Sequence, residues 1–518
     1  MKKIGIDFGT CNIKASERKK NGDIVSIKLT RGIENSMLPN IIAYDKKEDN
    51  DYYTVMGAPA IIKNVNEQNK IRSIKSHLLE YDWTRKLSFG KTVNAFEVTT
   101  DIMKEVYKQI YNMNKKEELS ATITVPVNFS KRQIEFVKKS AQKAGFNVNS
   151  IITEPFASFF SLMNDYMEEE HNVLIFDIGG GTLDLCLIEL KNEDGEILVE
   201  TQSTVGISFG GNNINELIIE KILYKRNPEE TKMALELQNN NLLNIVNRYN
   251  LMEAIDDLKR ELFEEDNNEE DKERELIVEY NKVSQDYGEI SIKDINSVLD
   301  ESKIASTIKK LLDDLFMDSE DMTIDELTDV FMVGGSSNIS YFRKVIEKYL
   351  KDNGHNDLDE LFEINDDTDT EERLYASVSK GATIYNFIND EDDDIKIRDR
   401  IPFCIFTKGS EDKKLTPLSK NDSFKNYFSR IDVLTDEMLK SKHIKLFQTI
   451  LGEEGKDVYL GNIKLPSEMD EDINLYRLKV NKAGDIIVEL GYLAGEHSGN
   501  SQFIVVDELL FELNEENL

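Results

Sequence analysis

The sequence contains Ile4-Gly5-Ile6-Asp7-Phe8-Gly9-Thr10 and, much later, Leu174-Ile175-Phe176-Asp177-Ile178-Gly179-Gly180-Gly181-Thr182-Leu183-Asp184. Each stretch is an apolar strand that ends in Asp, followed by glycine, threonine and a second apolar run. Glycines lack Cβ, so backbone N–H groups can close on phosphate oxygens, and an Asp at a strand end can hold Mg²⁺ through water. Either stretch alone is typical of an ordinary glycine hairpin, but two copies with the same Asp predict a phosphate clamp. The sequence has no G-x-x-x-x-G-K-S/T motif, so a P-loop is not the phosphate site.

A third glycine element, Val330–Ser337, joins an apolar run to a helical pattern. Gly334 and Gly335 allow close backbone approach, and Ser336 or Ser337 can cap a helix whose positive end faces a ligand. A tight strand-to-helix connection without any ligand explains this element equally well on its own.

The segment Leu251–Phe263 has helical spacing, with an apolar stripe and an opposite face that carries Asp256, Lys259, Arg260 and Phe263. Ion pairing on a solvated face, worth about 0.2–0.5 kcal/mol a pair, is one interpretation. An arginine stacked on an adenine ring is the other. The spacing alone leaves both open.

A β-α-β pattern lies between the two hairpins. A strand over Ala121–Val127 precedes a capping box, Ser130-x-x-Gln133, and a second strand leads to Glu154-Pro155. Open α/β sheets bind ligands at such strand ends, which makes Glu154 a candidate site residue, although a lone Glu before Pro is more often structural.

Composition excludes several classes of function. The 518 residues include 64 Lys and Arg against 98 Asp and Glu, a net charge of −34, which disfavours nucleic acid and acidic membrane surfaces as partners. No apolar stretch approaches the ~20 residues that span a bilayer, and the N-terminus has no signal-peptide core, so we expect a cytoplasmic protein. The 3 cysteines and 5 histidines show no spacing typical of disulfides or of zinc.

The pattern along the chain predicts an α/β region over residues 1–388, an acidic linker over 389–400 and an antiparallel β-sandwich over 401–518. The linker contains the acidic run Asp390–Asp394. The last region contains short stretches in which apolar and polar residues alternate, as in Tyr476–Val480.

In this order, the motifs resemble the ATPase domain of the seventy-kilodalton heat-shock chaperone family, within the actin–hexokinase superfamily. The resemblance runs from Met1 to about Phe387 and continues, more faintly, into the family's β-sandwich peptide-binding domain. It implies two lobes of RNase H-like fold that close over Mg-ATP. It is most specific in five segments: Ile4–Thr10, Ile123–Pro126, Ile151–Pro155, Leu174–Asp184 and Val333–Ser336.

The resemblance also implies roles for individual residues. Asp7 and Asp177 would position Mg²⁺ through water, and Thr10 and Thr182 would contact the γ-phosphate. Lys75, in the segment Ile71–Lys75, would orient the phosphate and the attacking water, with Glu154 assisting. Hydrolysis by such a site is mostly positioning and charge stabilisation. The residues implied to hold the rest of ATP or ADP are Gly9, Cys11, Gly179, Gly180, Gly181, Asp184, Gly210, Gly211, Asp256, Lys259, Arg260, Gly334, Gly335 and Ser336.

The chain departs from the family pattern around the nucleotide and in the linker. Asn212 and Asn213 stand where the family usually has acidic residues, Phe263 replaces a serine and Asn338 an arginine. These departures concern nucleotide affinity and exchange. The family's leucine-rich linker is replaced here by a charged run with two aliphatic residues, Ile395 and Ile397, so we expect altered communication between the domains.

The resemblance predicts an ATP-hydrolysing chaperone that binds extended apolar peptides and works with a J-domain partner and an exchange factor. The sequence ends at Leu518, which predicts a β domain without the family's helical lid, with Phe403, Ile405 and Phe406 lining the peptide groove. The alternative is a low-turnover, nucleotide-gated scaffold for one dedicated protein. A sugar kinase or a filament-forming protein on the same ATPase fold is a third, weaker reading.

Overall fold

The fold is taken from a computed structural model. It describes residues 1–29, 37–47, 52–62, 65–78, 83–114, 116–163, 169–193, 196–235, 242–263, 270–280, 283–319, 322–355, 358–363, 368–370, 372–391, 395–398, 404–408, 414–418, 427–429, 431–449, 457–469, 473–480, 486–494 and 502–510.

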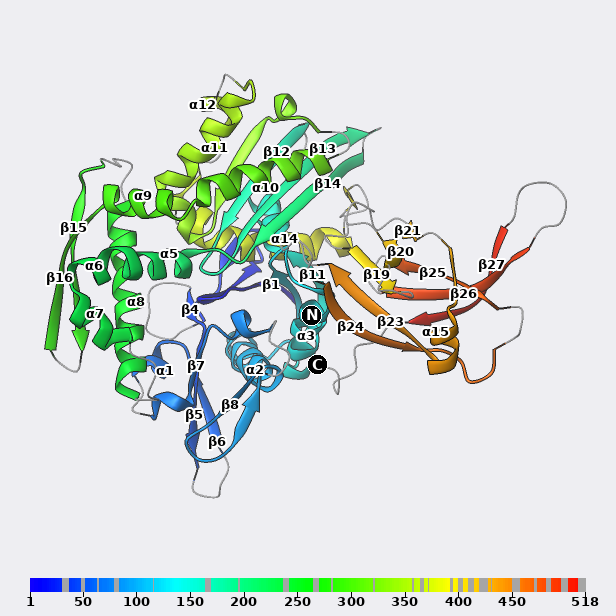
Figure 1. The fold of residues 1–518 in the computed structure, drawn as a ribbon, viewed down its shortest axis with the longest axis horizontal. Coiled ribbons are helices and arrows are strands. Elements are labelled where there is room, and N and C mark those ends of the chain that lie inside the picture. The colour runs from blue at the N-terminus through cyan, green and yellow to red at the C-terminus, as the bar shows by residue number, and fades with distance from the viewer. Residues whose placement is uncertain are drawn as a thin grey trace.

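Two large mixed sheets organise the first part of the chain (Figure 1). The sheet of the first lobe has the order β11-β10-β1-β2-β3, with β4 beside β2, and that of the second lobe has the order β17-β12-β13-β14-β18. In each, the leading strand of a hairpin runs parallel to one neighbour and antiparallel to its hairpin partner, so the two lobes repeat one topology. The strands are β1 (Lys2–Phe8), β2 (Asn12–Arg18), β3 (Ile24–Ser26), β4 (Leu38–Pro39), β10 (Leu119–Val125), β11 (Asn147–Thr153), β12 (His171–Ile178), β13 (Leu183–Glu193), β14 (Glu196–Ile207), β17 (Asp329–Val333) and β18 (Ile395–Arg398).

Smaller sheets and helices surround these two sheets, so the predicted α/β character is confirmed. The small sheets contain β5 (Ile41–Lys46), β6 (Tyr52–Met56), β7 (Lys70–Arg72), β8 (Thr84–Lys86), β9 (Thr92–Asn94), β15 (Glu273–Tyr280) and β16 (Val283–Ser291). The α-helices are α1 (Ala58–Ile62), α2 (Ala95–Met113), α3 (Lys131–Ala144), α4 (Glu154–Met163), α5 (Gly211–Ile218), α6 (Tyr224–Arg226), α7 (Pro228–Leu235), α8 (Leu242–Phe263), α9 (Ile292–Glu301), α10 (Ile304–Asp318), α11 (Ser340–Asp352), α12 (Leu358–Leu361), α14 (Ser377–Glu391) and α15 (Asp436–Ser441). Short 3₁₀ or π turns are η1 (Glu67–Asn69), η2 (Ile74–His77), η3 (Ile219–Leu223), η5 (Ile324–Glu326), η6 (Gly335–Asn338) and η7 (Glu372–Ala376).

Local sequence signals explain several of these boundaries. The predicted capping box of α3 is present, because the Ser130 side chain accepts from the Gln133 backbone and the Gln133 side chain accepts from the Ser130 N–H. Gly145 ends this helix with a φ of 115°, a backbone conformation that favours glycine. Among the described residues, no helix is both long and apolar enough to cross a membrane.

Helices α4 and α14 pack against each other between the two large sheets. Their backbones approach so closely that a Cβ on Gly381 would collide with the Ala157 carbonyl. Gly5 on β1 faces the same constraint from the Ser379 carbonyl of α14. In addition, the Asn386 side chain donates to the carbonyl oxygens of Ile4 and Ser120, each at 3.1 Å. Helix α14 is therefore joined firmly to the first lobe.

Two antiparallel sheets form the last part of the chain, with the orders β20-β19-β23-β24 and β21-β25-β26-β27, β22 pairing with β25. They share one apolar core that draws Ile405 and Leu446 from one sheet and Leu478 and Val488 from the other. The predicted alternation over Tyr476–Val480 is seen as buried Tyr476 and Leu478 between less buried neighbours. The strands are β19 (Cys404–Lys408), β20 (Lys414–Leu418), β21 (Tyr427–Phe428), β22 (Asp432–Val433), β23 (His443–Thr449), β24 (Asp457–Lys464), β25 (Leu475–Val480), β26 (Ile486–Ala494) and β27 (Gln502–Leu510).

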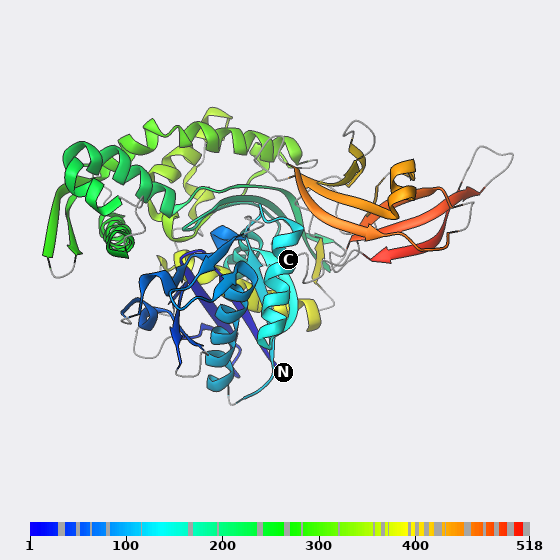
Figure 2. The same ribbon diagram turned by 60° about the horizontal axis from the view of Figure 1, so that its bottom comes forward.

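The two parts of the chain touch each other along α3, which lies beside the orange strands of the last part in both views (Figures 1 and 2). The Lys131 backbone N–H donates to the Gln448 side chain at 2.8 Å, and Ile134 packs on the core of the two sheets.

The predicted linker, residues 389–400, contains regular structure where it is described. Helix α14 runs to Glu391, and β18 pairs in parallel with Ile197–Glu200 of β14. Ile395 and Ile397 pack against the core of the second lobe, whereas the exposed Lys396 forms an ion pair with Glu196. Because successive side chains of a strand point to opposite faces, the two isoleucines can pack on the second lobe while the charged Lys396 stays at the surface.

Candidate functional site

The two Asp–Gly hairpins lie directly against each other. A Cβ added at Gly181 would lie 2.8 Å from Thr10 Oγ1, and one at Gly180 would collide with Cys11 Sγ. Only glycine therefore allows the turn of the second hairpin to approach the first this closely. The structure places both predicted phosphate loops at the junction of the two lobes.

The other predicted glycine segments surround the Gly179–Gly181 turn. The Gly211 N–H at the start of α5 donates to the Gly179 carbonyl at 2.9 Å, and Ser336 Oγ donates to the same oxygen at 3.1 Å. Gly334 lies so close to Asp177 that a Cβ on Gly334 would be 2.5 Å from Asp177 Oδ1. The φ of Gly334, 83°, also favours glycine. These loops, distant in sequence, form one wall of the site.

Lys75 and Glu154 form a buried ion pair between Lys75 Nζ and Glu154 Oε1. Glu154 is the first residue of α4, and Lys75 lies in η2, whose preceding residue Ser73 adopts a left-handed conformation with φ of 49°. Burial raises the pKa of Glu154 and the Lys75 charge opposes that rise. The structure thus joins two residues that the family resemblance placed in the site, although they are far apart in the sequence.

Asn40 is a positioning residue that the sequence did not reveal. Its side chain donates to the Gly9 carbonyl at 2.8 Å, its N–H donates to the Cys11 carbonyl at 2.7 Å, and its own carbonyl accepts from Ser73 N–H at 3.0 Å. It therefore ties the first hairpin to the turn that carries Lys75. A single Asn after a Pro has no pattern that would have indicated this.

Asp177 and Asp184 are buried carboxyl groups that lie opposite each other across the second hairpin. Burial, and then the charge of Glu154, raise the pKa of Asp184 to about 8. The pKa of Asp177 is raised well above its usual range, by burial first and then by Glu154 and Asp184. A cation next to these groups would lower both pKa values and be stabilised by them.

The donor set fits Mg²⁺ held through water. Asp184 Oδ2 is buried and has no hydrogen-bond partner among the described residues, which leaves a hard oxygen available for a hydrated cation. Within the described part of the chain, no group of three His, Cys, Asp or Glu side chains is arranged to hold a metal directly. The predicted water-mediated roles of Asp7 and Asp177 are compatible with both observations.

Lys14 is a second site residue that the sequence analysis missed. It lies on β2 directly opposite Asp7, and its Nζ is 3.1 Å from Asp7 Oδ2. Burial alone would lower the pKa of Lys14, but the Asp7 carboxylate outweighs burial and raises it. The register of the first hairpin would have indicated this residue, because it places position 14 across from position 7.

The residues on the predicted adenosine-binding face of α8 have different environments in the structure. Lys259 is buried, donates to the Gly211 carbonyl at 3.2 Å and pairs with Asp256 at 2.9 Å. Arg260 is instead exposed and pairs with Asp257 one turn earlier on the helix. In this structure Lys259 reaches the glycine loops, whereas Asp256 contacts Lys259 and accepts from the Asn215 side chain of α5 at 2.9 Å. Arg260 shows the surface ion pairing that was the first interpretation of this face.

The residues that depart from the family pattern contact other parts of the site. The Asn213 side chain accepts from the Gly210 N–H at 3.0 Å, and Cys11 Sγ lies 3.6 Å from Asn212 Oδ1 across the two lobes. Phe263 packs into the core of the second lobe, and the Asn338 side chain donates to its carbonyl oxygen.

The residues predicted to line a peptide groove do not form an open surface here. Phe403 lies outside the described residues. Ile405 and Phe406 are fully buried, Ile405 in the core shared by the two sheets and Phe406 stacked on Phe447 with ring centroids 5.8 Å apart. As placed, both are core residues of this part of the chain.

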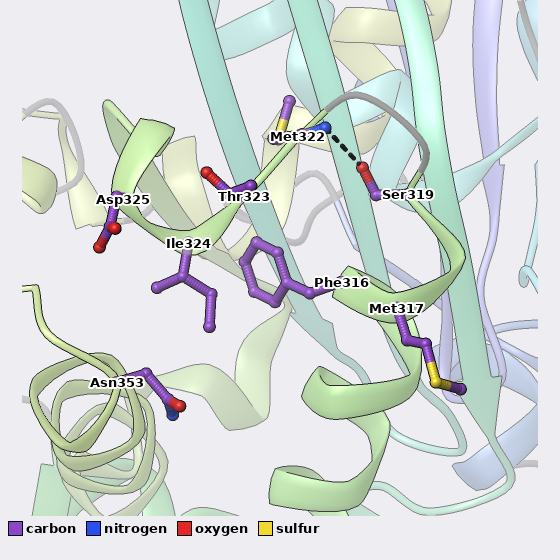
Figure 3. Close-up of a pocket in the computed structure, with 8 residues that line it drawn as sticks. All are labelled: Phe316, Met317, Ser319, Met322, Thr323, Ile324, Asp325 and Asn353. Carbon is purple, nitrogen blue, oxygen red and sulfur yellow. Dashed lines mark hydrogen bonds between the residues drawn. The ribbon is translucent and has the colours of Figure 1, made fainter.

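A hollow of about 380 Å³ lies away from the hairpins, between the end of α10, η5 and the end of α11 (Figure 3). Phe316 and Ile324 lie next to each other within it, and Met317 points outward. Among the described residues that line it, Asp325 is the one with a charge, so the described lining offers no cation for a phosphate group.

The fold and the site define a two-lobed protein built on a duplicated sheet, whose halves meet at twin Asp–Gly hairpins. A family model described as Hsp70 protein matches residues 3–450, and the chain belongs to the Hsp70 family. Among similar proteins, the chaperone protein HscA of Buchnera aphidicola subsp. Baizongia pistaciae is 23% identical over 367 residues, which cover 67% of this chain and 65% of that protein. The chaperone protein DnaK of Burkholderia cenocepacia is 25% identical over 485 residues, covering 86% of this chain and 68% of that protein. The chain thus spans about two thirds of the length of these relatives.

Proposed function

We propose that this protein is an ATP-hydrolysing chaperone whose nucleotide lies between the two lobes. The observation that carries the proposal is the contact of the twin hairpins, Gly180 and Gly181 against Thr10 and Cys11, with the buried Lys75–Glu154 pair beside them. Backbone N–H groups, hydroxyls and lysines gathered at one junction suit a phosphate tail, because phosphoryl transfer depends mainly on positioning and on charge stabilisation.

Under this proposal each side chain has a role set by its chemistry. Thr10 and Thr182 donate from their hydroxyls to the terminal phosphate, and Lys75 orients that phosphate and the attacking water. Glu154 holds Lys75 in place through their ion pair. Asp7 and Asp177 would hold Mg²⁺ through water. When bound, Mg²⁺ supplies positive charge at the phosphate oxygens.

We further propose that the last part of the chain is a β-sandwich that binds extended apolar peptide segments. Support comes from the core shared by its two antiparallel sheets and from the extent of the family match, which reaches residue 450. Strand β18, docked on β14, provides a physical link between the nucleotide lobes and this part. A J-domain co-chaperone and an exchange factor are the partners that the family resemblance supports.

The test is ATP turnover measured with and without an unfolded client protein. The proposal expects slow turnover that rises when the client is added, and that is lost in the Asp177→Asn variant. Turnover that ignores the client would instead favour the nucleotide-gated scaffold. Absence of ATP binding would contradict both functions.

A further inference from the structure

The duplicated hairpins carry side chains of different charge type at one equivalent position beside the site. In the second hairpin, Asp177 pairs across the strands with Asp184. In the first, Asp7 pairs with Lys14 at the equivalent register. The fold therefore places an ammonium group where the other lobe has a carboxylate.

The Lys14 side chain is largely enclosed, with 16% of its surface exposed against 7% for Asp7. Its Nζ lies 3.1 Å from Asp7 Oδ2, and its charge also interacts with Asp177 and Glu154. An ammonium group has three N–H donors, and Asp7 is the one hydrogen-bond acceptor found for it among the described residues.

The balance of charge at the junction shows why this lysine matters. The carboxylate of Asp7 would repel a phosphate tail, and the ammonium group of the buried Lys75 already pairs with Glu154. A lysine behaves as a compact point charge toward phosphate, so an ammonium group with free donors beside Asp7 can attract the tail.

We propose that Lys14 is a second phosphate-binding lysine, whose ammonium group contacts the phosphate tail of the nucleotide directly. This inference rests on the proposed function, because it assumes that the nucleotide lies at this junction. The alternative is a purely structural role, in which Lys14 neutralises the Asp7 carboxylate and does not contact the nucleotide. A test must therefore remove Lys14 without leaving Asp7 buried and unpaired.

The experiment compares ADP affinity, by calorimetry in EDTA, between Asp7→Asn and the double variant Asp7→Asn, Lys14→Met. Neither protein has a carboxylate at position 7, so an unpaired Asp7 does not contribute to the difference in ADP affinity. We expect the double variant to bind ADP about 10- to 100-fold more weakly, the range for a charged hydrogen bond. Equal affinities would overturn the inference.

Three further proteins complete the test. Lys14→Arg keeps a cation and is expected to bind ADP within about threefold of wild type, whereas a loss of tenfold or more would count against a charge contact. Lys19→Met removes an exposed lysine just beyond the same strand, which pairs with Glu17, and is expected to leave affinity unchanged. Wild-type protein that fails to bind ADP would refute the proposed function itself, which separates the two failures.

Discussion

The substitution Asp184→Asn is expected to make the nucleotide-free protein more stable while weakening its Mg²⁺-dependent binding of ADP. Asp184 is fully buried, its Oδ1 accepts from the Val127 N–H at 3.1 Å, and its Oδ2 has no partner among the described residues. An amide has almost the same shape, so the Val127 contact can persist while the ionisable carboxyl group is removed.

The magnitude follows from the pKa. Folding raises the pKa of Asp184 from 3.8 to about 8, so the group is mostly protonated in the folded state at pH 7 and ionised in the unfolded state. Each pH unit between 3.8 and 7 then removes about 1.4 kcal/mol of folding free energy, about 4 kcal/mol in all. A buried amide nitrogen without an acceptor costs about 1–3 kcal/mol, which leaves an expected gain of about 1–3 kcal/mol.

The sign of the pH dependence is also determined. Because the folded pKa is raised, the wild-type protein has the full contribution of this group below pH 4 and loses it as the pH rises through 8. The stability difference between Asp184→Asn and wild type should therefore grow from pH 5 to pH 8.

The assay is urea unfolding in EDTA, followed by circular dichroism at several pH values. Asp294 offers a control of opposite sign: burial alone would raise its pKa, but hydrogen bonds from Ser291 and Arg226 outweigh burial and lower it. Asp294→Asn should therefore lose stability at neutral pH. A stability difference for Asp184→Asn that is absent, negative or constant with pH would refute the reasoning.

Three shorter predictions concern the rest of the site. Lys75→Met should abolish ATP turnover, and it should also lower stability because Glu154 loses its ion-pair partner. The double variant Lys75→Met, Glu154→Gln should regain stability but not turnover. ATP hydrolysis by either variant would contradict the assigned roles. Gly180→Ala should weaken ADP binding at least tenfold, because its Cβ collides with Cys11; unchanged affinity by calorimetry would show that the hairpins need not meet. Ile397→Ser should speed tryptic cleavage after Arg398, and digestion at the wild-type rate would argue against docking of β18.

Much of the fold could be predicted because its signals are local. The strand-Asp-glycine-threonine pattern, the capping box of α3 and the alternation of β25 all depend on residues within one or two turns or strands of one another. The same holds for the family resemblance, whose segments are short and contiguous, and which implies the roles of Lys75 and Glu154 without any tertiary information.

Sequence patterns are less informative where burial decides the outcome. The charged run predicts altered communication between the domains, which stays a prediction, and in the structure its Ile395 and Ile397 pack against the core of the second lobe. The family resemblance placed Ile405 and Phe406 in a groove, whereas the structure buries both. In each case the deciding fact is what packs against the strand, and that depends on segments distant in sequence.

The two related hairpins, each with an Asp before glycines, can be predicted from the amino-acid pattern, because strand periodicity and turn residues act over short distances. The contact of Gly181 with Thr10, the hydrogen bond from Asn40 to Gly9 and the exposure of Arg260 become visible in the folded protein. Each of these features depends on how segments distant in sequence pack, so no local pattern encodes it. Lys14 combines a local and a tertiary feature. The register of a single hairpin places it opposite Asp7, whereas packing of the folded lobes brings its charge near Asp177 and Glu154.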